Sequence, residues 1–329
     1  MAVIDLPVTL PASKLMASIT SLIGEVRFQK TITPSTLVTD IVERSRIGNV
    51  EFGKGIVQTT KVDLQDVKDL SENSSAFTIS KPRMAQEVIA IDTYKFAPLS
   101  VSSILTKDAF LSGFAVEQFF AEVLDTLQDT KTFALYDVML NIIQSWVPAQ
   151  STQTITVNLK DTSTLSGVDL KVTNELNANE IAKTIRKTVN SMRVLSNKYT
   201  DVAKYTAQDG SQKDVKTALR GDDLRVIMND RFYTDIVADS IASLYHSDRI
   251  ADMFPNGMSS ELIPEDKMTD NKVICWISHP NKFALADFYN VQLSIVDPST
   301  LYTNYFLHYA YGAGVFKYLP AVKVIANFE

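Results

Sequence analysis

An uninterrupted run of 35 helix-compatible residues, from Gly113 to Val147, limits the possible folds more than any other feature of this sequence. Apolar side chains recur along it at helical spacing: Val116, Phe119, Phe120, Val123, Leu124, Leu127, Phe133, Tyr136, Met139, Leu140, Ile143 and Trp146. Pro148 follows and would end the helix. At ~1.5 Å per residue, a single helix would be a rod of about 50 Å. We predict one helix; the alternative is a break near Asp129 and Thr130 that gives a helical hairpin.

The segment before this helix is predicted to form two strands joined by a long polar connection. Ile56–Val62 is rich in β-branched residues, and Val88–Phe96 alternates in part between apolar and polar side chains. The connection over residues 63–85 is too long for a tight hairpin turn and too charged for a core. Because a two-stranded ribbon is marginally stable alone in water, it must lie on another surface, either its own domain or another subunit.

The first fifty residues differ from a domain core. Pro7, Pro11 and Pro34 interrupt short apolar segments among many Ser and Thr residues. Prolines at such spacing prevent long helices and favour extended chain. We expect a loosely attached N-terminal arm, with one or two helical turns around residues 40–45 that bury little.

The remainder is predicted to be mixed α/β, with a central sheet covered by helices. Strands are expected at residues 155–159, 224–229, 273–277, 293–296, 302–311, 315–318 and 322–326, and helices at 180–199 and 233–245. Seven of the residues from Tyr302 to Tyr318 are Tyr or Phe. Such a run could stack nucleic-acid bases, but in an acidic chain sheet core is the favoured interpretation.

Few residues are available for catalysis or metal binding. The chain has one cysteine, three widely separated histidines and a net charge of −6, which argues against a disulfide framework, a zinc cluster and tight wrapping of nucleic acid. Cys275 and His279 fall on one face of a predicted strand, but no third group to orient a base is indicated, so a structural role is favoured. No apolar run approaches the ~20 residues of a membrane span. We predict no catalytic, cofactor-binding or metal-binding residues.

The order of arm, hairpin, long helix, α/β region and closing strands resembles the major capsid protein of tailed bacteriophages, most closely that of small short-tailed podoviruses. This is the Johnson fold, which herpesvirus capsid floors and encapsulins share. The C-terminal half carries the resemblance, in the segments Leu224–Asn229, Val273–Ser278, Asp297-Pro298, Leu301–Tyr309 and the final strand to Phe328.

The resemblance implies an α+β fold with four parts. These are an N-terminal arm (1–50), an extended β-hairpin loop (51–100), a peripheral domain with the long spine helix (101–148 and 291–329) and an axial α/β domain (149–290). No Lys–Asn crosslink of the kind found in some members is predicted. Since nothing resembles a large scaffolding region, a separate scaffolding protein is expected.

The implied function is self-assembly as hexamers and pentamers into the icosahedral or prolate shell around a phage double-stranded DNA genome. The protein would be located in the virion after assembly in the host cytoplasm, with a portal as a further partner, no membrane contact and no sequence-specific DNA binding. A negative charge suits a DNA container, because a basic lining would hold the genome during packaging. The candidate contacts between subunits are charged residues of the hairpin: Lys61, Lys68, Asp69, Lys81 and Arg83.

Two other functions remain open from the sequence. An encapsulin-type nanocompartment shares the fold but encloses protein cargo. An α/β enzyme whose catalytic residues are dispersed in sequence would leave no motif.

Overall fold

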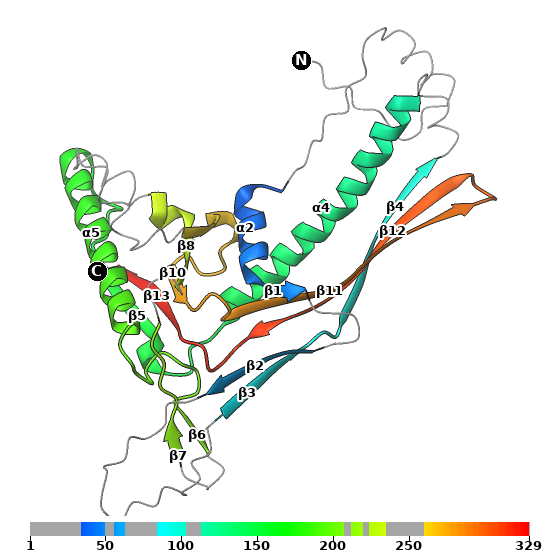
Figure 1. The fold of residues 1–329 in the computed structure, drawn as a ribbon. Coiled ribbons are helices and arrows are strands. Elements are labelled where there is room, and N and C mark those ends of the chain that lie inside the picture. The colour runs from blue at the N-terminus through cyan, green and yellow to red at the C-terminus, as the bar shows by residue number, and fades with distance from the viewer. Residues whose placement is uncertain are drawn as a thin grey trace, which may run out of the picture.

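The computed structural model describes residues 34–49, 56–62, 84–102, 113–206, 212–219, 224–234 and 260–328. Its strands form two larger sheets, each with a long helix beside it (Figure 1). Helix α4 (Gly113–Ser145) runs along the first sheet, and helix α5 (Gly167–Met192) lies at the far side of the second. The architecture is therefore mixed α+β, as predicted.

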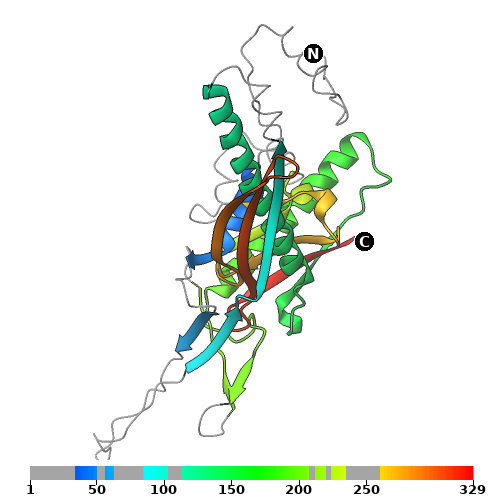
Figure 2. The same cartoon turned by 90° about the vertical axis from the view of Figure 1, so that its right-hand side faces the viewer.

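The first sheet is four-stranded, in the order β1 (Arg46–Asn49), β11 (Phe283–Asp297), β12 (Tyr302–Val315) and β4 (Thr93–Ser102). β11, β12 and β4 pair antiparallel, whereas β1 joins the edge of β11 in parallel. A β-bulge lies in β11 between Asp287 and Tyr289. Figure 2 shows the long strands of this sheet face on, with α4 behind them.

The second sheet is five-stranded, in the order β5 (Thr154–Leu159), β13 (Ala321–Phe328), β10 (Val273–Ser278), β8 (Arg225–Asn229) and β9 (Ser260–Ile263). All residues of β8 and β10 are buried, which explains their continuous apolar sequences. The apolar face of α5, including Ile181, Ile185 and Val189, contributes to the same core. The strands predicted for β5, β8, β10 and β13 are confirmed.

Smaller elements lie outside the two larger sheets. The predicted hairpin is present as β2 (Ile56–Val62) paired antiparallel with β3 (Met84–Ala90), and we call this pair the ribbon. A second hairpin joins β6 (Lys204–Thr206) to β7 (Gln212–Asp214). Two short 3-10 helices, η1 (Ser151–Gln153) and η3 (Glu265–Lys267), precede β5 and β10.

The prediction of one long helix is confirmed by α4, which is unbroken through its polar segment. Within that segment Lys131 is buried, its Nζ lies 2.6 Å from Asp287 of β11, and it sits over the Tyr309 ring. Thr126, Thr130 and neighbouring hydroxyls bond to carbonyls of their own helix. Lys131 therefore attaches the helix to the sheet, and the threonine hydroxyls are satisfied within the helix, so the polar segment does not end it.

The expectation of a loose arm up to residue 50 is wrong for its last part. Helix α2 (Thr36–Ser45) buries Val38, Ile41 and Val42 against the core that includes α4, and β1 then joins the first sheet. The side chain of Arg225 from β8 donates to the Ile41 carbonyl at 3.2 Å and to the Ser45 hydroxyl at 3.0 Å. Contacts with residues far along the chain therefore stabilise a helix too short to persist alone.

Several boundaries also differ from prediction. The strand expected at residues 88–96 is divided, because β3 ends at Ala90 and β4 starts at Thr93 in a different sheet. Helix α5 spans residues 167–192 rather than 180–199, and β12 continues through Gly312 and Gly314 to Val315. Most of the helix predicted at 233–245 lies outside the described residues. β13 pairs within the five-stranded sheet, so residues 291–329 contribute to both sheets.

Candidate functional site

A buried lysine is one of the charged groups in the described core and lies at the junction of the two sheets. Lys282, fully buried just before β11, donates from Nζ to Asp201 Oδ2 at 2.8 Å and to the Leu319 carbonyl at 2.8 Å. The ammonium also lies 5.3 Å from the ring centroid of Trp146, just past the end of α4. Burial lowers the pKa of Lys282, and the negative charges of Asp201 and Glu87 oppose that shift.

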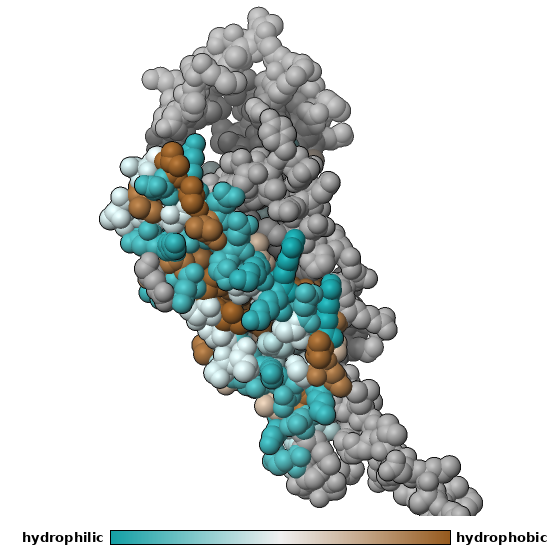
Figure 3. Space-filling model, turned by 90° about the vertical axis from the view of Figure 1, so that its left-hand side faces the viewer, coloured by the Kyte–Doolittle hydropathy of each residue, from teal (hydrophilic) through white to brown (hydrophobic). Residues whose placement is uncertain are grey.

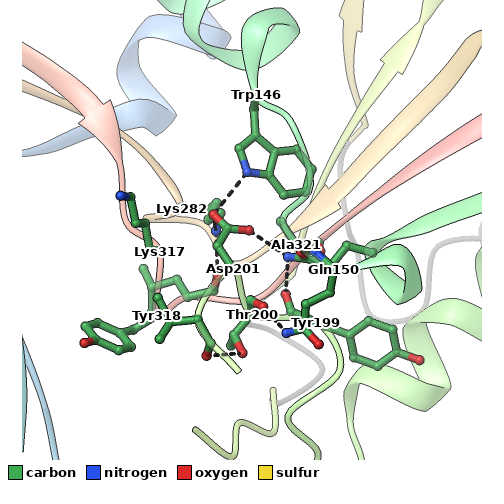
Figure 4. Close-up of polar contacts among 12 residues, drawn as sticks. Trp146, Gln150, Tyr199, Thr200, Asp201, Lys282, Lys317, Tyr318 and Ala321 are labelled. Carbon is green, nitrogen blue, oxygen red and sulfur yellow. Dashed lines mark hydrogen bonds and ion pairs between the residues drawn. The ribbon is translucent and has the colours of Figure 1, made fainter. Parts of the chain in front are cut away.

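The carboxylate of Asp201 accepts hydrogen bonds from two further residues of the junction. Its carboxylate accepts from Trp146 Nε1 at 3.2 Å and from Gln153 Nε2 at 2.7 Å, in addition to Lys282 (Figure 4). Gln150 donates to the carbonyls of Asn197 and Thr200, which holds the loop before Asp201 in place. A carboxylate that is 9% exposed and has three donors, one of them cationic, is a satisfied structural centre rather than a free reactive group.

The same junction holds the turn between β12 and β13. The N–H of Phe316 donates to the Lys282 carbonyl at 3.0 Å, and the N–H of Asp201 donates to the Lys317 carbonyl at 3.0 Å. His279 donates from its backbone to the Pro320 carbonyl at 3.0 Å. Turn 316–320 is therefore hydrogen-bonded to segments from both sides of the junction.

Neither Cys275 nor His279 forms a reactive pair. Cys275 is fully buried inside β10, and burial raises the pKa of its thiol, so the thiolate needed for attack is disfavoured. His279 lies beyond the end of β10, where its Nδ1 accepts the backbone N–H of Asn281 at 3.1 Å. Among the described residues there is no group of His, Cys, Asp and Glu that could hold a metal ion, and no described helix is long and apolar enough to span a membrane.

An apolar surface is found on the side of the first sheet that faces away from α4, which we call the open face. On it Tyr94, Phe96, Leu293 and Ile295 are 71, 58, 48 and 57% exposed. Phe96 lies beside Phe306, with ring centroids 6.1 Å apart. Figure 2 views this side of the sheet. The four exposed side chains present on the order of 450 Å² of apolar area, about half of what one partner contributes to a standard protein interface.

A second set of exposed apolar side chains lies on α5. Val168, Val172 and Leu176 follow one another at intervals of four residues and are at least half exposed. Figure 3 shows brown apolar patches between teal polar ones on the side of the molecule where α5 lies. Apolar residues at helical spacing that are not buried in the subunit are typical of surfaces that contact other proteins.

Of the five predicted contact residues, only Lys61 lies within the described part of the chain, so their prediction stays a prediction. Lys61 lies on β2, where it pairs with Ala85 of β3. Lys68, Asp69, Lys81 and Arg83 lie outside the described residues. Lys282 and Asp201 were not predicted from the sequence. The one available signal was a lysine directly before the apolar residues Phe283–Ala286, where a charge requires a partner.

Comparisons with known proteins agree with this architecture. Residues 28–325 match the family described as "Phi29-like phage major capsid protein". No curated protein sequence matches the chain.

Three similar solved structures come from phages. One is "Capsid structure of Staphylococcus phage Andhra" (TM-score 0.59, 10% identity, 93% of this chain and 89% of that chain). Another is "Structure of head fiber and inner core protein gp22 of native bacteriophage P68" (TM-score 0.60, 10% identity, 92% and 88%). A third is "Asymmetric unit of bacteriophage PhiM1 mature capsid" (TM-score 0.54, 11% identity, 93% and 91%). At such low identity these likenesses establish the fold.

Proposed function

Since the chain belongs to the Phi29-like phage major capsid protein family, we propose that its copies join as hexamers and pentamers through contacts made by the ribbon. The protein is a major capsid protein that forms the icosahedral capsid of a phage, is located in the virion and is not an enzyme. The resemblance to podovirus capsid proteins is confirmed, and the encapsulin and enzyme alternatives are set aside.

The ribbon is the main support for the proposed contacts. Within the described residues, β2 pairs only with β3, so the two strands form a sheet of their own. Such a pair gains stability when it lies on a further surface. The connection between the strands carries Lys68, Asp69, Lys81 and Arg83, whose charges suit pairing with a neighbouring subunit.

The proposal also assigns roles to the parts of the fold. The ribbon belongs to the extended loop over residues 51–100. The four-stranded sheet and α4 form the peripheral domain with its spine, and the five-stranded sheet and α5 form the axial domain. In this assignment β4, the first half of β11 and β13 change parts relative to the sequence-based bounds of 51–100, 149–290 and 291–329. The role of N-terminal arm falls to the residues before α2.

The open face supports burial between proteins in the shell. On this face, the paired residues of β4, β12 and the part of β11 over 291–297 include no lysine or arginine. The described part of this face therefore offers no cation for DNA phosphates. We expect the enclosed double-stranded DNA to be held without sequence-specific contacts. A separate scaffolding protein and a portal are further proposed partners.

Replacing residues 61–83 with a short Gly-Ser turn tests the role of the ribbon. We expect a soluble subunit that unfolds cooperatively but forms no closed particles by electron microscopy, because the replaced segment is rich in charged and polar residues, which cores exclude. Normal particles from this variant would contradict the proposal, as would a subunit that fails to fold.

Charge reversal offers a milder test with a matched control. Lys61→Glu combined with Lys81→Glu is expected to lower particle yield, whereas Lys61→Arg combined with Lys81→Arg keeps the charges and should assemble normally. Equal yields from the two pairs would rule out these charges as contacts. Protease should cut the connection in free subunits faster than in shells.

A further inference from the structure

A carboxylate of the ribbon forms hydrogen bonds with a distant turn of its own subunit. Glu87 of β3 accepts the backbone N–H of Lys317 at 2.7 Å through Oε1 and that of Tyr318 at 3.0 Å through Oε2. Two successive N–H groups that converge on an anion form a concave binding site, and hydrogen bonds to a charged acceptor are stronger than neutral ones. The two partners are 230 and 231 residues away along the chain.

The chain passes close to β12 directly after Glu87. A Cβ at Gly312 would lie 2.3 Å from the Ala90 carbonyl oxygen and 3.0 Å from the Ile91 Cα, so only glycine fits this crossing. At Gly314 a Cβ would meet the Ile89 side chain at 3.3 Å, a tight contact with a flexible group. The end of β3 is therefore confined from one side by the backbone of β12.

The turn that donates to Glu87 is itself held in place by hydrogen bonds. Turn 316–320 is bonded to Lys282 and Asp201 at the junction of the two sheets, and Figure 4 shows Lys317 and Tyr318 beside that network. The negative charge of Glu87 also raises the pKa of Lys282, so the carboxylate and the buried ammonium attract each other. The point at which the ribbon is attached is thus rigid. Beyond that point, the described strands of the ribbon pair only with each other.

We propose that Glu87 is a latch that fixes the direction in which the ribbon leaves its subunit, with Gly312 as the crossing point that lets the latch close. Glu87 and Gly312 are positioning residues: they touch no neighbour in this proposal, but they aim the segment that does. The inference rests on the proposed role of the ribbon in contacts between subunits. The latch itself lies within one subunit and can be tested there.

The first test measures the latch in the unassembled full-length subunit. In Glu87→Ala, amide hydrogen exchange of Lys317 and Tyr318 should accelerate by about tenfold to a hundredfold, as expected for loss of a charged hydrogen bond. Asp92→Ala, which removes an exposed carboxylate near the same crossing, serves as the control and should leave this exchange unchanged. Unchanged exchange in Glu87→Ala would overturn the proposal.

The second test measures direction. Spin labels at Lys61→Cys and Lys272→Cys report the distance from the ribbon to the five-stranded sheet, and buried Cys275 stays unlabelled. The distance distribution should broaden in Glu87→Ala and in Gly312→Ala, and less in Gly314→Ala. Faster exchange with an unchanged distance distribution would show that the hydrogen bonds do not set direction, and would overturn the proposal.

Assembly separates this proposal from the one on which it rests. If the ribbon has its proposed role, Glu87→Gln, which keeps the side-chain shape, should fold with a normal Tm and give fewer or misshapen particles. If the variant with residues 61–83 replaced forms normal shells, the role of the ribbon is refuted, and the two measurements on free subunits still decide whether the latch exists.

Discussion

Replacing Trp146 with alanine should lower the free energy of unfolding of the subunit by about 3–5 kcal/mol. The indole is 6% exposed just past the end of α4, and its ring meets that of Phe283 edge-on with centroids 5.9 Å apart. It also lies under the Lys282 ammonium and donates to Asp201 at 3.2 Å. Alanine would remove all of these contacts and leave a cavity between α4 and β11.

The Trp146→Phe variant divides this effect into its parts. Phenylalanine keeps most of the buried area and the ring contacts but has no N–H for Asp201. Because Asp201 retains Lys282 and Gln153 as donors, the expected loss is about 1.5 kcal/mol, the low end for a hydrogen bond to a charged group. The alanine variant should therefore lose at least twice as much stability as the phenylalanine variant.

Urea unfolding of the unassembled subunit measures both losses. Trp276, which is 1% exposed in β10, remains as a fluorescent reporter in each variant, and far-ultraviolet circular dichroism checks that unfolding is cooperative. A loss below about 1.5 kcal/mol in Trp146→Ala would refute the reasoning, since it would mean that the ring fills no essential space in the core. Equal losses in the two variants would assign the whole effect to the hydrogen bond.

Three other outcomes are expected. Lys282→Met should cost about 3–5 kcal/mol in the same assay by leaving Asp201 without its cation, and a double-mutant cycle with Asp201→Asn should show strong coupling; additive losses would contradict this. Hydrogen bonds from Ser299 and Thr300 lower the pKa of Asp297 from 3.8 to about 2. The ionised carboxylate therefore stabilises the fold above pH 3.8, and this stabilisation is lost as the pH falls from 3.8 toward 2. The difference in Tm between wild type and Asp297→Asn should therefore shrink from pH 3.8 toward 2, and a constant difference would count against it. Phe96→Lys on the open face should change the free energy of unfolding by less than about 0.5 kcal/mol yet reduce particle yield; unaffected assembly would show that this face is not buried in the shell.

Local pattern was sufficient to predict the elements whose burial agrees with their periodicity. In α4 the apolar stripe through Leu127, Tyr136 and Ile143 is buried, and in β10 every residue is buried. The first turns of α5 did not follow this rule. Val168 and Val172 face solvent there, so periodicity did not predict that the helix begins at Gly167.

The remaining errors come from contacts between residues far apart in sequence. The burial of α2 depends on its packing in a core with α4 and on Arg225, which lies 184 residues beyond Ile41. Likewise, nothing near Glu87 in the sequence indicates that Lys317 and Tyr318 will provide its hydrogen-bond donors. A single sequence contains the residues of such a site but not their proximity, so only the three-dimensional structure assembles it.

The β-bulge in β11 changes which side chains of the strand face each side of the sheet. Leu285 and Asp287 face the α4 side, and without an extra residue Val291, Leu293 and Ile295 would follow them there by simple alternation. Because the bulge lies between Asp287 and Tyr289, Gln292 and Ser294 pair instead with Leu307 and Tyr305 on the α4 side. The aliphatic residues consequently pair on the open face. One additional residue thus changes a strand that would turn these apolar side chains toward α4 into one that leaves Leu293 and Ile295 exposed on the open face.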